Sequence, residues 1–329
     1  MKAPGRKWWT EFPPASGAAV MSTAIVSIGM HLTGFEVLSK ALLALAGAVW
    51  VVLACAFGLR ALWDRSHWRT DADTPPALTA VAATSVLGTR IALLGWHEVA
   101  AVLLVLAAAV WPFLLLAVIR HWQRRGMPGV VFLVCVATQG LAVLAGTLGP
   151  QAGDWLMWIA LCLFAFGIAL YVDALLRFDF RQVLTGAGDH WIAGGALAIS
   201  TVAGSKLVAS PVWTGWPHTV LRTTTLVLLA LAAAWYAVLA AAELWRPRPY
   251  YGIRRWSTVF PLGMTAVAAL SVSTAADIAW LDRPGRVLLW VAAAVWLVVL
   301  IGFVRSLGRS EDHAQGGDGQ PERHEARAA

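Results

Sequence analysis

Long apolar stretches separated by short clusters of charge constrain this chain more than any other feature of its sequence. Each stretch has about 20 residues, the length of an α-helix that crosses the ~30 Å hydrocarbon core of a bilayer. The composition agrees, because 59% of the 329 residues are hydrophobic and only 13% are charged. Soluble globular domains do not have this composition. The sequence therefore predicts a polytopic, all-α integral membrane protein.

The apolar stretches predict ten membrane-spanning helices. Their expected ranges are 15–34, 38–59, 77–95, 98–119, 130–149, 155–176, 190–208, 220–243, 257–276 and 285–306. Residues 1–14 form a predicted cytoplasmic segment, and residues 15–306 form a predicted transmembrane pore domain. Residues 307–329 are rich in Gly, Glu, Arg and His and lack large apolar side chains, so we expect a disordered cytoplasmic tail.

Lysine and arginine alternate from one side of the predicted spans to the other. The positive-inside rule places the richer side in the cytoplasm, together with both termini, and predicts a multi-pass protein of the plasma or inner membrane. The net charge of +7 thus reflects basic residues that orient the spans in the membrane. The sequence contains no nucleic-acid-binding motif. The poorer side carries Lys40, Lys206, Arg222, Arg283 and Arg286, and the richer side carries Lys2, Arg6, Lys7, Arg60, Arg65, Arg69, Arg120, Arg124, Arg125, Arg177, Arg181, Arg246, Arg248, Arg254, Arg255, Arg305 and Arg309.

A second alternation distinguishes odd from even spans. Odd spans are rich in hydroxyls and small residues, whereas even spans are almost purely apolar. Lipid-facing helices are apolar, and helices that face one another or a water-filled lumen accept polar side chains. We therefore predict five hairpins around a central pore, odd helices inner and even helices outer. The predicted pore-lining residues are Ser22, Thr23, Ser27, Thr84, Ser85, Thr138, Gln139, Ser200, Thr201 and Thr265.

For each of these hydroxyls taken alone, hydrogen bonding between helices is the favoured explanation. The alternation as a whole favours a pore. Hydroxyl groups without carboxylates suit anions, because O–H donors stabilise negative charge without binding it tightly. Arg90, inside the third span, either attracts an anionic substrate or forms a structural contact at the interface or with Glu98. Lys206 has the same two interpretations, with snorkelling to the interface favoured.

Three short motifs, taken in order along the chain, resemble the tellurite-resistance/dicarboxylate transporter family. They are VATQGLAVL from Val136 in the fifth span, HWIAGGALAISTVAG from His190 in the seventh, and WSTVFPLGM from Trp256 in the ninth. That family also contains plant slow anion channels and fungal malate and sulfite carriers. The likeness is to actinobacterial members in particular and extends from about Phe12 to Arg305.

The resemblance implies a ring of five hairpins around a pore, with three chains assembled as a homotrimer and one pore in each. It also implies that a phenylalanine closes the pore as a gate. By motif this role falls on Phe260, and the adjacent Pro261 would kink the helix and turn the ring into the lumen. The implied substrates are small oxyanions or C4-dicarboxylates of the tellurite, sulfite and malate class.

Three alternatives remain open. A proton-coupled malate or succinate carrier would need a titrating group inside the conduit. A membrane redox subunit would hold haem between histidines, and His31, His97, His190 and His218 are all expected at extracellular span ends. A structural scaffold would have fully packed polar faces. The sequence has no HExxH, GxSxG or Walker motif, so we expect neither an enzyme nor a bound cofactor or metal.

Overall fold

The computed structural model describes residues 14–64, 73–122, 125–247 and 252–316. In these residues ten long helices follow one another as five hairpins, each predicted span corresponding to one helix. The pairs are α1 (Gly17–Leu32) with α2 (Glu36–Trp63), α4 (Thr79–Ala92) with α5 (His97–Arg120), α6 (Leu133–Ala152) with α7 (Asp154–Arg177), α9 (Ile192–Val208) with α10 (Trp216–Trp245), and α11 (Trp256–Ala275) with α12 (Asp282–Gly316). A one-turn helix, α8 (Gln182–Thr185), precedes the fourth pair.

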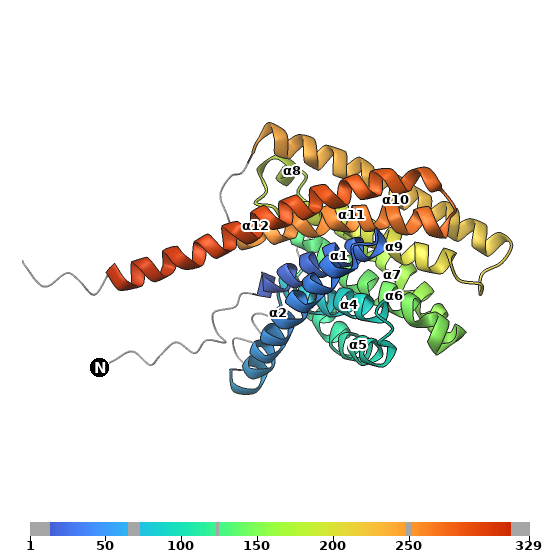
Figure 1. The fold of residues 1–329 in the computed structure, drawn as a ribbon, viewed down its shortest axis with the longest axis horizontal. Coiled ribbons are helices and arrows are strands. Elements are labelled where there is room, and N and C mark those ends of the chain that lie inside the picture. Colours follow the sequence, from blue (N-terminus) through green and yellow to red (C-terminus); the bar gives the residue numbers. More distant parts are fainter. Residues whose placement is uncertain (1–13, 65–72, 123–124, 248–251, 317–329) are drawn as a thin grey trace, which may run out of the picture.

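The first helix of every hairpin belongs to a closed inner ring. Helix α1 packs against α4, α4 against α6, α6 against α9, α9 against α11, and α11 again against α1. The second helix of each hairpin lies outside its partner (Figure 1). The predicted arrangement, odd spans inside and even spans outside, is confirmed.

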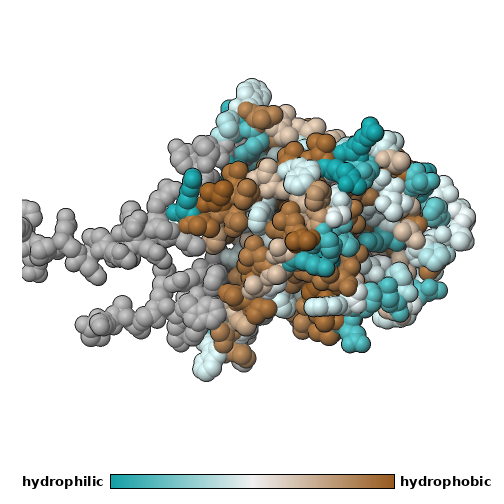
Figure 2. All heavy atoms as spheres, in the orientation of Figure 1, coloured by the Kyte–Doolittle hydropathy of each residue, from teal (hydrophilic) through white to brown (hydrophobic). Residues whose placement is uncertain are grey.

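The inner helices are much more buried than the outer helices. In α6 and α9, 94% of the most apolar window is buried, whereas in α2 and α12 only 17% is buried. Large apolar side chains such as Phe113 and Leu176 project from the outer helices and are more than two-thirds exposed. Figure 2 shows hydrophobic residues spread over the flank of the bundle. Such a surface is stable only against lipid or another apolar surface.

Two inner helices are shorter than a membrane span. Eight helices among the described residues are long and apolar enough to cross a bilayer. The other two, α1 and α4, have 16 and 14 residues, about 24 Å and 21 Å at 1.5 Å per residue. A 3₁₀ turn extends each of them: η2 (Pro14–Ser16) precedes α1, and η3 (Pro75–Leu78) precedes α4. With its 3₁₀ turn, each of the two helices approaches a length of ~30 Å, the thickness of the hydrocarbon core. That all ten helices cross the membrane stays a prediction.

A 3₁₀ turn precedes every inner helix. Besides η2 and η3, these are η4 (Gly129–Phe132), η5 (Asp189–Trp191) and η6 (Ile253–Arg255). Neighbouring turns contact one another, η2 with both η3 and η6, η3 with η4, and η4 with η5. All five inner helices therefore start at one end of the ring and run in the same direction. We call this end the amino end and the opposite end the carboxyl end.

The boundaries at the two chain ends differ from those predicted. Helix α12 continues to Gly316, beyond the predicted span end at residue 306, so the first part of the predicted tail is helical. The remainder of that tail, residues 317–329, and residues 1–13 of the predicted amino-terminal segment lie outside the described residues.

Candidate functional site: an axial conduit

A narrow cavity lies on the axis of the inner ring. All five inner helices contribute to its wall, which consists of Ile25, Ile28 and Leu32 of α1, Val86 and Thr89 of α4, Gly140 and Val143 of α6, Ile199, Val202 and Lys206 of α9, and Met264, Val267 and Ser271 of α11. These residues come from the middle and the carboxyl halves of their helices. The space open to the centres of water-sized spheres is about 30 Å³, which holds roughly two water molecules.

The wall of this cavity is mostly aliphatic, with three polar side chains near the carboxyl end. Lys206 is the one charged residue among those that line it, and Thr89 and Ser271 supply hydroxyls. Leu32 is 39% exposed, so the cavity opens to the outside at this end. A hydrophobic wall with few polar groups is a known design for gating and selectivity in channels.

Lys206 reaches the axis because its neighbour on α6 has no side chain. A Cβ atom at Gly146 would lie 2.9 Å from the Cβ atom of Lys206. Only glycine therefore leaves room for the lysine stem between α6 and α9. On α9, Ile199, Val202 and Lys206 follow each other at spacings of three and four residues, which places them on one helical face.

Phe260 lies one helical turn below the cavity, towards the amino end. Phe260, Met264, Val267 and Ser271 share one face of α11 by their spacing, and the last three line the cavity. One turn before the lining residues, the other inner helices carry Met21, Ala82, Val136 and Gly195 on the same faces.

We call Met21, Ala82, Val136, Gly195 and Phe260 the plug layer. Met21 and Phe260 are 2% exposed, and Ala82 and Val136 are fully buried. Water therefore does not reach this level of the axis. Phe260 is the one aromatic side chain of the layer, and Gly195 and Ala82 are its smallest members.

Pro261 faces the neighbouring inner helix. A Cβ atom at Gly195 would lie 2.8 Å from the Cγ atom of Pro261, so these two residues bring α9 and α11 close together. Pro261 lacks the N–H that would continue the hydrogen-bond ladder of α11. Its carbonyl accepts a hydrogen bond from Thr265 Oγ1 at 2.9 Å. Pro261 thus fixes the position of the helix that carries Phe260.

The ten predicted pore-lining residues are not among the residues around the axial cavity. Three of them are threonines that accept a hydrogen bond from a tryptophan on the outer helix of a neighbouring hairpin, at Nε1–Oγ1 distances of 2.9–3.0 Å. The pairs are Trp296–Thr23, Trp50–Thr84 and Trp111–Thr138. Each threonine also donates to the carbonyl four residues earlier. These three tryptophans lie within the outer helices α12, α2 and α5.

The other seven predicted residues also bond within or between helices. Gln139 Nε2 donates to the Phe164 carbonyl of α7 at 3.0 Å, and Ser27 donates to the Ser39 carbonyl of α2 at 2.7 Å. Ser22 donates to the carbonyl of Trp256 in α11. The remaining four, Ser85, Ser200, Thr201 and Thr265, donate to a carbonyl one turn earlier in their own helix. A pore-lining role for these residues stays a prediction.

Arg90 lies in a buried ionic cluster at the carboxyl end. Its side chain is fully buried, Nη2 donates to Glu36 Oε1 at 2.9 Å, and Nε donates to Ser39 Oγ at 2.9 Å. His31 Nδ1 lies 2.6 Å from the other oxygen of Glu36. The carboxylate that Arg90 meets is thus Glu36 of α2, and not Glu98 of its own hairpin. The cluster ties α1, α2 and α4 together.

We predict that Glu36→Gln lowers the thermal unfolding temperature of the purified protein without changing its anion selectivity. The substitution leaves the Arg90 guanidinium buried without a counter-charge, which is costly in a low-dielectric interior. Lys40→Gln is the control, because the ammonium of Lys40 is 60% exposed and lies 3.8 Å from the same Glu36 carboxylate. Equal unfolding temperatures for the two variants would contradict the prediction.

Two ion pairs lie at the amino end. Arg177 Nη2 lies 2.9 Å from Asp173 Oδ1, four residues earlier in α7. Glu243 of α10 pairs with Arg255 of η6 at 2.8 Å. Arg255 lies beside the start of α11, so this pair joins α10 to the helix that carries Phe260.

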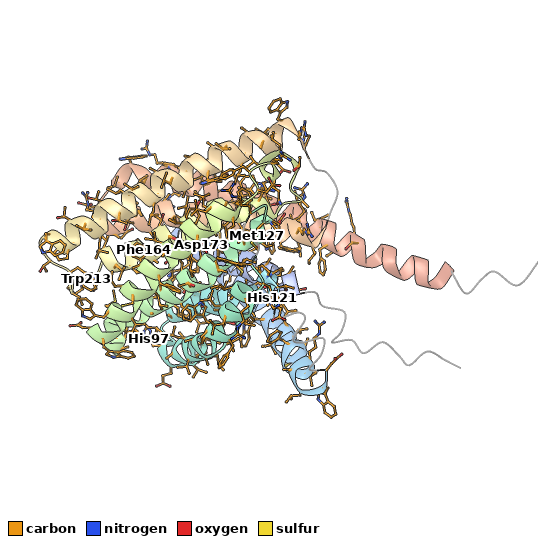
Figure 3. The ribbon with its side chains drawn as sticks, turned by 180° about the vertical axis from the view of Figure 1, so that it is seen from behind. His97, His121, Met127, Phe164, Asp173 and Trp213 are labelled. Atoms are coloured by element: carbon orange, nitrogen blue, oxygen red, sulfur yellow. The ribbon has the colours of Figure 1, made fainter. Side chains whose placement is uncertain are left out.

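The histidines do not gather at one end of the molecule. His190 belongs to η5 at the amino end, whereas His31, His97 and His218 lie at the carboxyl end, so the expectation that all four share one side is wrong. Along α5, His97 and His121 lie at opposite ends (Figure 3). Within the ranges that the structure describes, no group of three or more His, Cys, Asp or Glu side chains could hold a metal ion.

A larger cavity lies off the axis, between the first two hairpins. Its space for water-sized spheres is about 420 Å³, and α1, α2, η3, α4 and α5 line it with mainly apolar side chains. Trp50 and Thr84, which bond to each other, form part of its wall. It opens between outer helices and is separate from the axial conduit.

The sequence did not indicate the plug layer around Phe260, and for Lys206 it favoured snorkelling to the interface over attraction of an anion. The pattern that would have found them is the line of residues four apart along each inner helix, such as Met21–Ile25 and Phe260–Met264. The predicted pore-lining residues were chosen for their polar side chains, and these lie on other faces of the inner helices than the residues around the cavity. The axial faces are instead aliphatic, with Lys206 and Ser271 at one end.

The fold and this site define an integral membrane protein with a closed ring of inner helices around an axial conduit. The family model described as voltage-dependent anion channel (SLAC1) matches residues 11–304. The chain belongs to this family, which confirms the resemblance to tellurite-resistance/dicarboxylate transporters.

Two relatives come from Mycobacterium tuberculosis. They are the uncharacterized membrane protein MT1776 of strain CDC 1551 / Oshkosh and the uncharacterized membrane protein Rv1735c of strain H37Rv. Each is 32% identical to this chain over 166 residues, which cover 45% of this chain and 81% of the relative. The mycobacterial source agrees with the predicted actinobacterial type.

Proposed function

We propose that this protein conducts small anions across the membrane along the axis of its inner ring, with one conduit in each chain. Family membership supports membrane anion transport. The proposal further places the protein in the plasma membrane, with the amino end of the ring and both termini in the cytoplasm, assembled as a homotrimer. The described arginines Arg60, Arg120, Arg177, Arg246 and Arg255 all lie near the amino end, which supports this orientation.

The observation that carries the proposal is the axial cavity with Lys206 in its wall. A conduit for anions needs a path isolated from lipid and a field that favours negative charge. The five inner helices supply the isolation, because most of their residues are buried. Lys206 supplies positive charge where the described lining residues include no carboxylate.

In this proposal the structure represents a closed state and Phe260 is the gate. The aromatic ring fills the axis at the level where the inner helices carry Ala82 and Gly195. The plug layer excludes water, so an anion would lose its hydration there without compensation, which is a large free-energy barrier. Movement of one side chain would open the path.

Anion flux into proteoliposomes tests the proposal. Protein reconstituted in liposomes is expected to pass chloride or nitrate faster than protein-free liposomes, and to exclude potassium and sodium. Comparison of chloride, nitrate, sulfite and malate then ranks the substrates. Absence of flux for every anion, in wild type and in Phe260→Ala alike, would refute conduction.

A proton-coupled dicarboxylate carrier is the second candidate. It requires a titrating group in the conduit, and Lys206 is such a group among the residues around the cavity. A pH gradient imposed across the liposome membrane separates the two candidates. The carrier requires malate accumulation driven by that gradient, whereas conduction requires flux that follows the electrochemical gradient of the anion alone.

A further inference from the structure

We propose that the ammonium of Lys206 and the hydroxyl of Ser271 bind one small monovalent inorganic anion, such as chloride or nitrate, at the carboxyl end of the conduit. This assigns a substrate class and rests on the proposed function. The two residues come from facing inner helices, α9 and α11, and both line the axial cavity.

Lys206 is the one cation around the axial cavity, and no described carboxylate forms an ion pair with it. Arg90 and Lys40 share the carboxylate of Glu36. Arg286 pairs with Asp282 at 2.7 Å. Among the described residues, the ion pairs of the carboxyl end leave Lys206 without a counter-ion. An ammonium in an apolar wall is stabilised by a bound anion.

Ser271 has an available hydroxyl. Most buried serines and threonines of the inner helices donate to a carbonyl one turn earlier, as Ser200 and Thr265 do. Ser271, by contrast, makes no hydrogen bond to another residue in the described ranges, and it is only partly buried. Its O–H can therefore donate to a ligand in the cavity. A cation and a free donor then face the same small space.

The size and the single charge of the site select the ligand. The cavity accommodates about two water molecules, and the rest of its wall is aliphatic. One lysine compensates one negative charge. The cost of removing an ion from water grows with the square of its charge, so a dianion such as malate would leave one charge uncompensated in this wall. The geometry therefore favours a monovalent inorganic anion over a C4-dicarboxylate.

Anion-dependent stability measures binding without transport. Thermal unfolding of the detergent-purified protein is followed in nitrate, chloride or malate, against gluconate at constant ionic strength. Nitrate and chloride are expected to raise the unfolding temperature, since a ligand of the folded state stabilises it. Lys206→Met abolishes this rise, Lys206→Arg retains part of it, and Ser271→Ala weakens the apparent affinity several-fold.

Lys40→Met is the matched control, a lysine at the same end but outside the axial wall, and it is expected to keep the full anion effect. If Lys206→Met does not fold, Lys206→Gln replaces it. An anion effect that persists without the Lys206 charge would overturn the site. A Lys206-dependent effect of malate as large as that of nitrate would overturn the assigned class.

Flux in the Phe260→Ala background distinguishes failure of the site from failure of conduction. Adding Lys206→Met to this variant is expected to lower nitrate flux about tenfold or more, because a nearby unit charge in a low-dielectric wall strongly affects anion occupancy. Lys206-dependent binding with no flux in any variant would refute conduction and keep the site. Flux that does not depend on Lys206, with no Lys206-dependent binding, would refute the site and keep conduction.

Discussion

Phe260→Ala is expected to raise anion flux through the reconstituted protein roughly ten- to a hundredfold, since each ~1.4 kcal/mol removed from a barrier is a factor of ten in rate. Phe260 is 2% exposed, and in the proposed function its ring closes the axis at the plug layer. Truncation to alanine would leave a continuous path from the plug layer to the cavity at Met264. The measurement is chloride or nitrate flux in proteoliposomes at equal protein density.

Phe132→Ala is the matched control for this gate. Phe132 is also fully buried, but it packs with Tyr171 of α7 at a ring distance of 5.2 Å, away from the axis. It should lower stability, as buried Phe→Ala changes do, and leave the flux per folded molecule unchanged. Phe260→Leu should give intermediate flux. Equal flux for wild type and Phe260→Ala, in preparations that conduct, would remove Phe260 from the gate.

Gly129→Ala is expected to be the most destabilising single-methyl change that we can identify. A Cβ atom at residue 129 would lie 2.4 Å from the carbonyl oxygen of Asp189 and 2.6 Å from the Cα atom of His190. These are backbone atoms, so no side-chain rotation relieves the overlap. The turns η4 and η5 would have to separate, and with them the starts of α6 and α9. We expect a loss of about 3 kcal/mol or more.

The measurement is the yield of monodisperse protein and its thermal unfolding temperature. Gly252→Ala is the control at the same end of the molecule. Its backbone is extended, with φ at −155°, and a Cβ atom there would meet nothing within 4 Å. It should change stability by less than about 0.5 kcal/mol. Similar yields and unfolding temperatures for the two variants would show that the η4–η5 contact can relax.

Much of the architecture could be predicted because it follows from solvation. An apolar run of about 20 residues has few alternatives to a spanning helix, since backbone groups in hydrocarbon must bond within their own segment. The contrast between Val99–Val118, nearly all apolar, and the hydroxyl-rich inner helices then separates helices that face lipid from helices that face protein. These constraints require no knowledge of any contact, so the inner and outer sets were predicted correctly.

The candidate site could not be predicted to the same depth. A threonine in a membrane helix can donate to its own backbone, accept from a neighbouring helix or face a lumen, and composition is the same in all three cases. Thr84 and Thr138 accept bonds from Trp50 and Trp111 of outer helices. Their direction depends on how each helix is rotated within the ring, and that rotation is set by packing between hairpins.

The charged residues inside the spans also could be predicted only in part. The sequence identified Arg90 and Lys206 as cations inside spans, and it could not say which one was compensated. The partner of Arg90 is Glu36, 54 residues earlier in another hairpin. Lys206 reaches the axis because Gly146 of α6 leaves space for its stem. Long-range partners of this kind arise only when hairpins distant in the sequence pack side by side.

The sequence by itself determined the helices, the inner and outer sets, the family and the position of Phe260 in its motif. Each of these follows from local composition or from residues close together in the chain. The tertiary structure decided which side chains face the axis, because five inner helices must be placed and rotated together before an axis exists. Around the axial cavity it places mainly aliphatic side chains, with Lys206 and Ser271 towards the carboxyl end.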